Sequence, residues 1–356
     1  MRIALLNLPV DNNYGGNLQR YALIKVLQDM GYDVTHLNLR FCWQLPWYKK
    51  PFSYSKRIIK WLVLGRDVHI NQEKYQRLEY IRNCSLIEPF YQKYIKHSDT
   101  IFSKEGFLKY LDYDAYIVGS DQVWRKKIAL GYLSTMFLDF IPRSLAVKRI
   151  AYGVSLGTSE NELSQSEINK LGYLYKQFNS VSVRELSAIP LLSSYGWRVP
   201  EAVKVLDPTF LLNKEDYIKL INDENTDSSG GVIFCYILDM TKEKEKIIEN
   251  ESKKQKLPTI IMGLKSGVSI ERWLSYFLDA KSIITDSYHG LVFSIIFNKP
   301  YKLIRNQFRG NARFDSVLNE LNLSDDGMNV NWRKTNEKMQ ELKLKSIRFL
   351  NSALSM

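Results

Sequence analysis

A short polar run begins an otherwise apolar predicted helix in the last third of the chain. The sequence TDSYHGLVFSIIFNKP covers residues 285–300 and follows a β-branched run that is typical of a buried strand. Asp286, Ser287 and His289 therefore lie where a strand passes into a helix, which in a doubly wound α/β fold is the sheet edge where ligands bind. The free N–H groups of a helix start favour an anion there. The alternative is that Asp286 or Ser287 only caps the helix and His289 packs beside it.

A second polar turn, DNNYGGNLQRYAL at residues 11–23, joins the first predicted strand to the first predicted helix. Its glycines permit close approach of the backbone, and Asn13 and Asn17 offer amide hydrogen bonds, so both asparagines are candidate binding residues. The turn contains neither the GxGxxG fingerprint nor a Walker lysine, and it does not point to nucleotide binding.

A third turn, VGSDQVW at residues 118–124, again follows a predicted strand directly. Asp121, Gln122 and Trp124 bring an acid, an amide and an indole to one sheet edge. Because sugars present hydroxyl edges and an apolar face, this combination predicts a carbohydrate platform. A capping aspartate and a packing tryptophan are the alternative interpretation.

The elements that must position these turns alternate between strand and helix along the 356 residues, which predicts parallel sheets flanked by helices. The polar stretch at 222–230 is the expected linker, so one α/β domain spans 1–221 and the second spans 231–332, with a cleft between them. A basic amphipathic helix within 333–356 is expected to pack on its own protein. The expected strands lie at residues 2–8, 33–39, 113–120, 148–157, 180–185, 202–207, 231–238, 257–263, 281–285 and 301–305.

Composition narrows the class of protein. Hydrophobic residues make up 45% of the chain, which excludes disorder, and no run resembles a membrane span or a signal peptide. Cys42, Cys84 and Cys235 form no CxxC pair and suit a reducing compartment, so we expect a soluble cytoplasmic chain. A net charge of +12 favours an anionic partner, but no nucleic-acid-binding motif is visible. The other three histidines lack spaced partners, so no metal site is expected.

The segment from Val34 to Arg66 contains no Asp or Glu. Within it, residues 41–66 interleave three tryptophans with lysines and arginines. Aromatic and basic residues together suit a bilayer interface, where rings settle at headgroup depth and cations meet anionic lipid. The alternative is an insertion whose aromatic residues pack on the N-terminal domain.

Taken in order, several motifs resemble the polysaccharide pyruvyl transferase family. They span about residues 3 to 320 and comprise NNYGGNLQRYAL, YDAYIVGSDQVW, YGVSLG, SVRE, DPTFLL and TDSYHGLVFSIIFNKPY. Tyr288 stands where the family often has phenylalanine, and the insertion at 41–66 follows no family pattern. That insertion leaves the identity and docking of the acceptor open.

The resemblance implies two Rossmann-like domains in a glycosyltransferase-B-like arrangement, with the acceptor on the N-terminal side and the donor on the C-terminal side. It implies phosphoenolpyruvate as donor, a pyruvyl ketal formed across two sugar hydroxyls, and release of phosphate. The acceptor would be a sugar or a lipid-linked oligosaccharide at the inner face of the membrane, and no cofactor is implied. The family's donor-contacting His and Arg correspond to His289 and Arg184.

These residue types suit the implied chemistry. Phosphoenolpyruvate carries about three negative charges near neutral pH, so its site needs several cations and helix-start amides. Arg184 offers a fork that matches a carboxylate or a phosphate. The further candidate donor-binding residues are Ser287, Gly290, Arg309 and Arg313.

Ketal formation needs a proton for the methylene carbon and a base for the sugar hydroxyls. His289, kept protonated beside an anion, is the expected acid, and Asp121 is the expected base. Asp286 lies three residues before His289, so it is expected to share its helix face and to orient the ring.

Two other functions stay open from the sequence. One is a sugar-nucleotide-dependent glycosyltransferase of the same architecture. The other is a non-catalytic glycan-binding or lipid-binding protein that uses the segment 41–66.

Overall fold

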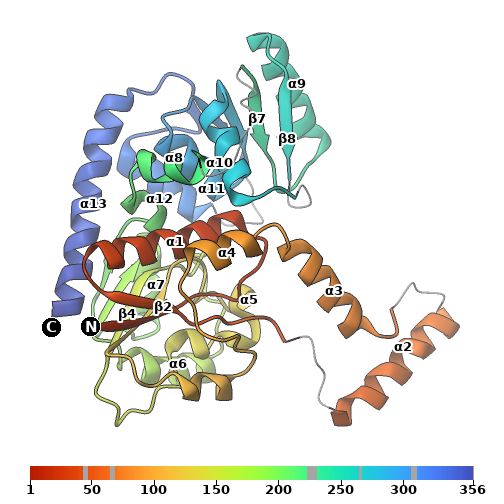
Figure 1. Ribbon diagram of the computed structural model, residues 1–356, viewed down its shortest axis with the longest axis vertical. Helices are drawn as coiled ribbons and strands as arrows, with labels where there is room; N and C mark the ends of the chain where they lie inside the picture. The colour runs from red at the N-terminus through yellow and green to blue at the C-terminus, as the bar shows by residue number, and fades with distance from the viewer. Residues whose placement is uncertain (43–46, 65–68, 223–230, 264–266, 306–310, 356) are drawn as a thin grey trace.

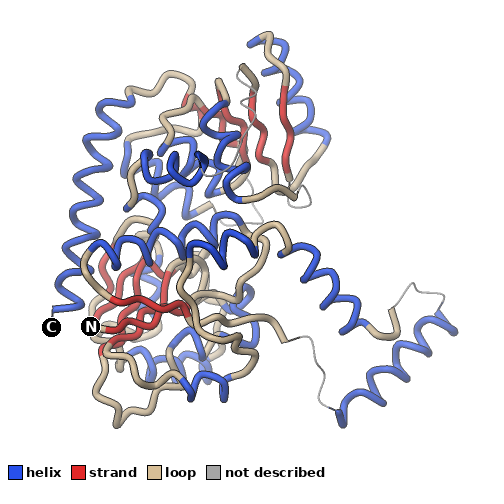
Figure 2. The backbone as a smooth tube through the Cα atoms, in the orientation of Figure 1, coloured by secondary structure: helices blue, strands red, loops and turns tan. Residues whose placement is uncertain are grey.

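The computed structural model describes residues 1–42, 47–64, 69–222, 231–263, 267–305 and 311–355. They form two α/β units, each built on its own sheet, which we call the first and the second layer. A helical hairpin projects from the first layer (Figures 1 and 2). The expected linker lies outside the described residues except for Asn222. No helix among the described residues is long and apolar enough to cross a membrane.

The first sheet has six parallel strands in the order β2-β1-β3-β4-β5-β6. Its central strands are continuous apolar runs because helices cover both faces of the sheet. Leu5 of β1 pairs with His36 of β2 on one side and with Ile117 of β3 on the other. The strand order reverses between β1 and β3, which creates a switch point at their carboxyl ends. The strands are β1 (Arg2–Leu6), β2 (Asp33–His36), β3 (Ala115–Gly119), β4 (Lys148–Val154), β5 (Ser180–Val183) and β6 (Ala202–Lys204).

The second sheet has the order β11-β10-β9-β7-β8, and its own switch point lies between β7 and β9. Four strands are parallel, as predicted, but the two-residue edge strand β11 runs antiparallel to β10. The strands are β7 (Ile233–Tyr236), β8 (Thr259–Met262), β9 (Ser282–Thr285), β10 (Tyr301–Leu303) and β11 (Asp326–Gly327).

The helices follow the predicted alternation, and side-chain caps define where many of them begin. Helix α6 starts with a capping box between Ser164 and Glu167, and α11 starts at the cap Ser287. The helices of the two layers are α1 (Tyr14–Asp29), α4 (Glu88–Tyr94), α5 (Lys126–Ala129), α6 (Gln165–Tyr175), α7 (Ala188–Ser194), α8 (Lys214–Asn222), α9 (Lys242–Gln255), α10 (Ile270–Asp279), α11 (Tyr288–Ile296), α12 (Ala312–Leu321) and α13 (Trp332–Ser355).

The two layers are joined by packing as well as by the chain. Helix α8 precedes the expected boundary yet packs on the second layer, where the ring of Tyr217 lies 5.0 Å from that of Phe293. Helix α13 runs back along the first layer, and its Ser346 hydroxyl accepts a hydrogen bond from the backbone of Leu206 (Figure 1). The prediction that the C-terminal helix packs on its own protein is confirmed. One continuous core therefore fixes how the two switch points face each other.

The hairpin consists of α2 (Lys50–Leu64) and α3 (Gln72–Cys84) and stands outside both layers (Figure 1). Phe41 at its base packs against Tyr80 and Tyr132, as an insertion folded onto the domain would. Trp61 does not pack in this way, since about half of its surface is exposed. Trp43 and the side chain of Trp47 lie outside the described residues.

Candidate functional site

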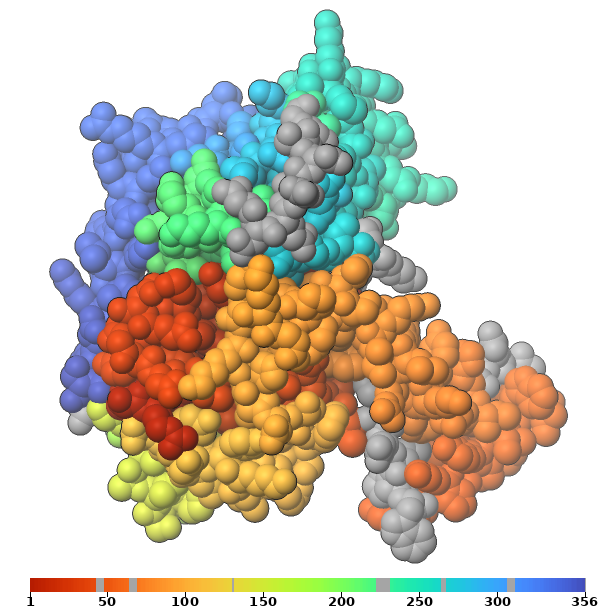
Figure 3. Space-filling model, in the orientation of Figure 1, coloured from red at the N-terminus to blue at the C-terminus, as the bar shows by residue number. Residues whose placement is uncertain are grey.

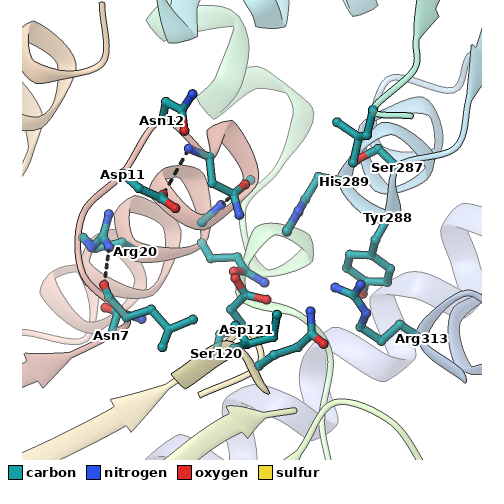
Figure 4. A pocket seen from close by; sticks show the side chains of 18 of the residues that line it. Asn7, Asp11, Asn12, Arg20, Ser120, Asp121, Ser287, Tyr288, His289 and Arg313 are labelled. Carbon is teal, nitrogen blue, oxygen red and sulfur yellow. Dashed lines mark hydrogen bonds between the residues drawn. The ribbon is translucent and has the colours of Figure 1, made fainter. Parts of the chain in front are cut away.

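A cavity of about 710 Å³ lies where the carboxyl ends of the two sheets meet. Its walls come from the turns after β1 and β3 in the first layer and after β7 and β9 in the second, with α12 completing the rim (Figure 4). A pocket between two switch points is the usual ligand site of such folds. The described lining residues include Asn7, Asp11, Asn12, Asn13, Gly15, Gln19, Arg20, Ser120, Asp121, Gln122, Arg125, Asp239, Ser287, Tyr288, His289 and Arg313.

Two helices begin at this cavity, α1 from the first layer and α11 from the second. Asn13 caps α1 by accepting from the N–H of Gly16 at 3.1 Å, and Ser287 caps α11 by accepting from Gly290 at 3.4 Å. The ends of both helices place partial positive charge at the cavity, which favours an anionic ligand. Gly290 itself lies behind the wall, because a Cβ there would stand 2.0 Å from the hydroxyl of Thr285. Gly290 is not among the described residues that line the cavity, and its contact with the donor stays a prediction.

Gly15 allows the two layers to approach at the cavity. A Cβ on this residue would stand 1.8 Å from Nδ1 of His289, which no real contact permits. The neighbouring Gly16 has room, since its Cβ would meet Asn13 at 3.5 Å, an ordinary contact distance. Only glycine at position 15 therefore leaves His289 in its place.

We expect Gly15→Ala to displace the His289 ring and to weaken binding of inorganic phosphate at least about tenfold, a loss of about 1.4 kcal/mol. Gly16→Ala is the matched control in the same helix turn and should leave phosphate affinity within about twofold of the wild type. Isothermal titration of both variants measures the difference. Equal phosphate affinity in the two variants would contradict the assignment of the His289 ring to the anion site.

Several buried polar atoms, at the cavity or on Arg184 directly behind its lining residues Asp121 and Tyr288, have no hydrogen-bond partner among the described residues. They are Nε and one terminal nitrogen of Arg184, Nε2 of His289, the hydroxyl of Tyr288 and the hydroxyl of Ser120. Leaving such a group unpaired costs about 1–3 kcal/mol, so a cluster of them calls for a ligand that pairs them. Arginine nitrogens and hydroxyls are donors, and a ligand rich in acceptor oxygens would satisfy them together.

Arg184 and Arg313 lie on Tyr288. Their guanidinium carbons are 4.7 Å and 5.3 Å from the centroid of its ring. Both arginines are at least nine-tenths buried. The aromatic ring thus holds Arg313 at the cavity wall and Arg184 behind it through cation–π contacts. The unpaired hydroxyl of Tyr288 adds a donor that a phenylalanine would lack.

Asp207 anchors the site and was not foreseen as a site residue. One of its carboxylate oxygens accepts from Arg184 at 2.6 Å and lies 3.9 Å from Nε2 of His289, while the other accepts from Thr209. Gln19 of α1 donates to it as well. Burial opposes its ionisation, but Arg184 and the donors from Thr209 hold the pKa of Asp207 below its ordinary value. The only sequence signal was the DPTFLL motif, in which an aspartate before proline looks like a simple cap.

The pKa of His289 differs from the expectation. Burial, together with the charges of Arg184 and Arg313, lowers the pKa of His289 to about 4, and the carboxylates of Asp207 and Asp121 only partly oppose this. The ring is therefore neutral near pH 7 when no anion is bound. The expectation that His289 is kept protonated needs a bound anion to supply the opposing charge.

Two carboxylates from the first layer face the cavity (Figure 4). Asp121 lies 3.6 Å from Arg184, and it follows Ser120 in an unusual pair of left-handed residues with φ of 65° and 43°. Strained backbone of this kind concentrates at functional turns. Asp11 was not foreseen, although it begins the motif DNNYGG; burial raises its pKa to about 6, and the charge of Asp121 adds to this. A carboxyl group with that pKa can accept or return a proton near neutral pH.

Two of the predicted acceptor residues lie elsewhere. Trp124 belongs to the core, where its ring stacks on Phe137 at 4.5 Å and its Nε1 donates to the carbonyl of Met136 at 2.9 Å. Its large apolar surface gains more from that burial than from a wet cavity. Asn17 uses its amide to donate to the carbonyls of Asp11 and Asn13, so it braces the turn and does not line the cavity.

Asp286 does not orient His289 in the predicted way. Because Ser287 is the N-cap, Asp286 precedes the helix and the spacing of helix neighbours does not apply to it. Its carboxylate accepts from the backbone of Leu238 at 2.6 Å and from Lys244 at 2.6 Å, which ties the ends of β7 and β9 together. Asp207 is the carboxylate that approaches the ring.

Two of the remaining predicted residues line the cavity, and one lies outside the described residues. Gln122 and Asn13 line the cavity, and Gln122 accepts from Arg125 at 2.8 Å. Their contact with the acceptor stays a prediction. Arg309 lies outside the described residues. Among the described residues no three His, Cys, Asp or Glu side chains gather as a metal site, and independence of metal stays a prediction.

Comparison with known proteins agrees with this geometry. The sequence model of the family described as polysaccharide pyruvyl transferase matches residues 13–301 of the chain. No curated protein matches significantly.

Solved structures show the same fold. The chain is similar to UDP-N-acetylglucosamine 2-epimerase from Rickettsia bellii, with 12% sequence identity and a TM-score of 0.50 over 99% of this chain and 96% of that chain. It is also similar to the UDP-GlcNAc 2-epimerase from Neisseria meningitidis bound to UDP-GlcNAc, with 11% identity and a TM-score of 0.50 over 99% and 94% of the two chains. At such identities the likeness concerns the fold alone, and it confirms the glycosyltransferase-B-like arrangement.

Proposed function

Because the chain belongs to the polysaccharide pyruvyl transferase family, we propose that it transfers the enolpyruvyl group of phosphoenolpyruvate to two hydroxyls of a sugar and releases phosphate. The observation that supports this donor is the cluster of unpaired buried donors at Arg184, Tyr288 and His289, between two helix N-termini. Phosphoenolpyruvate has a carboxylate and a phosphate close together, and both are acceptors that such a cluster binds. The acceptor is a sugar or a lipid-linked oligosaccharide of a polysaccharide precursor.

The overall reaction forms two C–O bonds at C2 and one C–H bond at C3 of the donor. It breaks the bond between C2 and the phosphate oxygen and converts the C2–C3 double bond into a single bond. Two sugar hydroxyls each lose a proton; one proton is balanced by the new methyl group and the other leaves with phosphate. The site must therefore accept protons on the acceptor side and deliver one to the methylene carbon. Asp121 and Asp11 stand on the acceptor side as bases, and His289 stands on the donor side as the acid.

The neutral state of His289 in the free site fits this cycle. Arrival of the donor brings negative charge beside the ring and offsets the effect of Arg184 and Arg313 on its pKa. His289 then takes up a proton that it can give to the methylene carbon. Arg184, held by Asp207, supplies the fork for one anionic group.

Proton uptake on binding is the expected signature. At pH 6 the free ring is neutral, since its pKa is about 4, and in the complex it should be largely protonated. Binding of phosphoenolpyruvate should therefore take up close to one more proton in the wild type than in His289→Gln. Calorimetric titration in buffers of different ionisation enthalpy measures this difference. Equal uptake by the two proteins would show that His289 does not titrate with the donor.

Ligand-dependent thermal shift tests the choice of donor. Phosphoenolpyruvate at about 100 times its dissociation constant should stabilise the chain by about 2.7 kcal/mol, whereas UDP-sugars and GDP-sugars should give no comparable shift. The reverse pattern would favour the sugar-nucleotide glycosyltransferase that the sequence leaves open. No shift with any of these ligands would favour a non-catalytic binding protein.

A further inference from the structure

Helix α2 exposes a stripe of large apolar side chains. Phe52, Ile59, Leu62 and Val63 have 75%, 57%, 66% and 72% of their surface exposed. Their spacing places them on one side of the helix, which we call the α2 outer face. The opposite side faces α3 through Arg57, whose guanidinium pairs with Glu73 at 2.6 Å. The apolar stripe is therefore turned away from the rest of the chain.

The position of the helix adds to this exposure. In the space-filling view the hairpin forms a lobe beside the body of the molecule (Figure 3). The apolar side chains of α2 therefore do not form the edge of a hydrophobic core. A soluble protein seldom exposes a contiguous patch of this kind unless the patch meets a partner.

The charges beside the stripe identify the partner. Helix spacing places Lys56 and Lys60 beside the outer face, whereas Lys50 lies on the side of α3, near Glu73. The segment from 34 to 66 carries no acidic residue. Among the described residues neither Lys56 nor Lys60 forms an ion pair, and Glu73 of α3 is already paired with Arg57. Cations beside a large apolar stripe match an interface that is anionic at its surface and apolar beneath it.

We propose that the α2 outer face docks on an anionic lipid bilayer. The helix has 15 residues and is about 22 Å long, so it lies in the plane of the interface and its apolar side chains enter the headgroup boundary. A second copy of this chain is disfavoured on the same face, because a symmetric contact would set lysines against lysines. The proposal rests on α2 alone and uses no step of the proposed reaction.

Flotation with lipid vesicles tests the proposal on the full-length chain. Vesicles of phosphatidylcholine with about one third phosphatidylglycerol should carry the wild type, and vesicles of phosphatidylcholine alone should carry it at least about tenfold less well. Replacing Phe52, Ile59 and Val63 together with serine should lower binding to the anionic vesicles at least about tenfold. Because these side chains are exposed, the variant should unfold at the wild-type temperature.

Two matched controls distinguish vesicle binding by the α2 outer face from nonspecific adsorption of the protein to lipid. Replacing the exposed residues Leu108, Val199 and Leu344 with serine removes three apolar side chains elsewhere and should leave vesicle binding unchanged. Replacing Lys56 and Lys60 with glutamine should lower binding at least about tenfold, whereas the same change at Lys170 and Lys176 should lower it much less.

Three results would overturn the proposal. They are absence of binding to anionic vesicles, equal losses in the outer-face and control variants, and a concentration-dependent dimer in the wild type that the serine variant abolishes without lipid. None of these readouts uses phosphoenolpyruvate. Failure here is therefore distinguishable from failure of the proposed function, which ligand-dependent thermal shift measures.

Discussion

Replacing Asp207 with asparagine should lower the free energy of unfolding by about 3–5 kcal/mol, the usual cost of removing one partner of a buried ion pair. Asp207 is 1% exposed and Arg184 is 2% exposed, and their side chains are joined at 2.6 Å. Asparagine keeps the shape of the side chain but removes its charge. The guanidinium of Arg184 then has Asp121, at 3.6 Å, as a weaker counterion. Urea denaturation of the two proteins measures the loss.

The same variant should bind phosphate more tightly than the wild type. The carboxylate of Asp207 lies behind the cavity wall and repels an anion bound near Arg184, and its removal leaves Arg184 free to pair with phosphate. Glu337→Gln, which breaks an exposed ion pair with Arg333, is the control and should change neither quantity appreciably. A destabilised Asp207→Asn that phosphate fails to stabilise would contradict an anion site at Arg184.

Replacing His289 with glutamine should lower kcat by about 10²–10⁴-fold, the usual contribution of a general acid. Glutamine can still donate a hydrogen bond to the donor, so KM for phosphoenolpyruvate should change far less. Steady-state kinetics with the wild type and with His69→Gln as control measure the split, since His69 is exposed in the α2–α3 hairpin. A raised KM with unchanged kcat would limit His289 to binding.

The wild-type kcat should also fall as pH rises through the pKa of His289 in the donor complex. The protonated ring is the working form, and the bound donor raises its pKa above the value of about 4 in the free site. The Gln variant should lack this decline. A flat wild-type profile between about pH 6 and pH 9 would count against the acid role.

Much of the fold can be predicted from local patterns in the sequence. The central strands β3 and β9 are largely apolar runs that end in polar turns, so the sequence is enough to place Asp121 and His289 at carboxyl edges. Parallel strands bring such turns to one edge of each sheet. The family resemblance adds Arg184 to the predicted site residues. The structure brings these three side chains together, since Asp121 and His289 line the cavity and Arg184 lies behind its wall, 3.6 Å from Asp121.

What could not be predicted depends on contacts between distant segments. Gly15 packs against His289, which is 274 positions away, and no local sequence pattern indicates such a contact. The role of Asp207 in the site likewise depends on its ion pair with Arg184, a residue from another segment. Trp124 follows Asp121 by three residues, yet the core packing of its ring decides that it points away from the cavity. Asp286 was assigned to the helix because sequence patterns do not fix the N-cap to a single residue.

The most direct test of the central claim is to follow both products of transfer in one reaction. The chain is incubated with phosphoenolpyruvate and a panel of free and lipid-linked oligosaccharides, inorganic phosphate is quantified, and the sugars are analysed by mass spectrometry. We expect one acceptor class to gain a pyruvyl ketal in a one-to-one ratio with phosphate, and Arg184→Met to release neither product. Consumption of a sugar nucleotide without loss of phosphoenolpyruvate, or phosphate release that leaves every sugar unmodified, would contradict pyruvyl transfer.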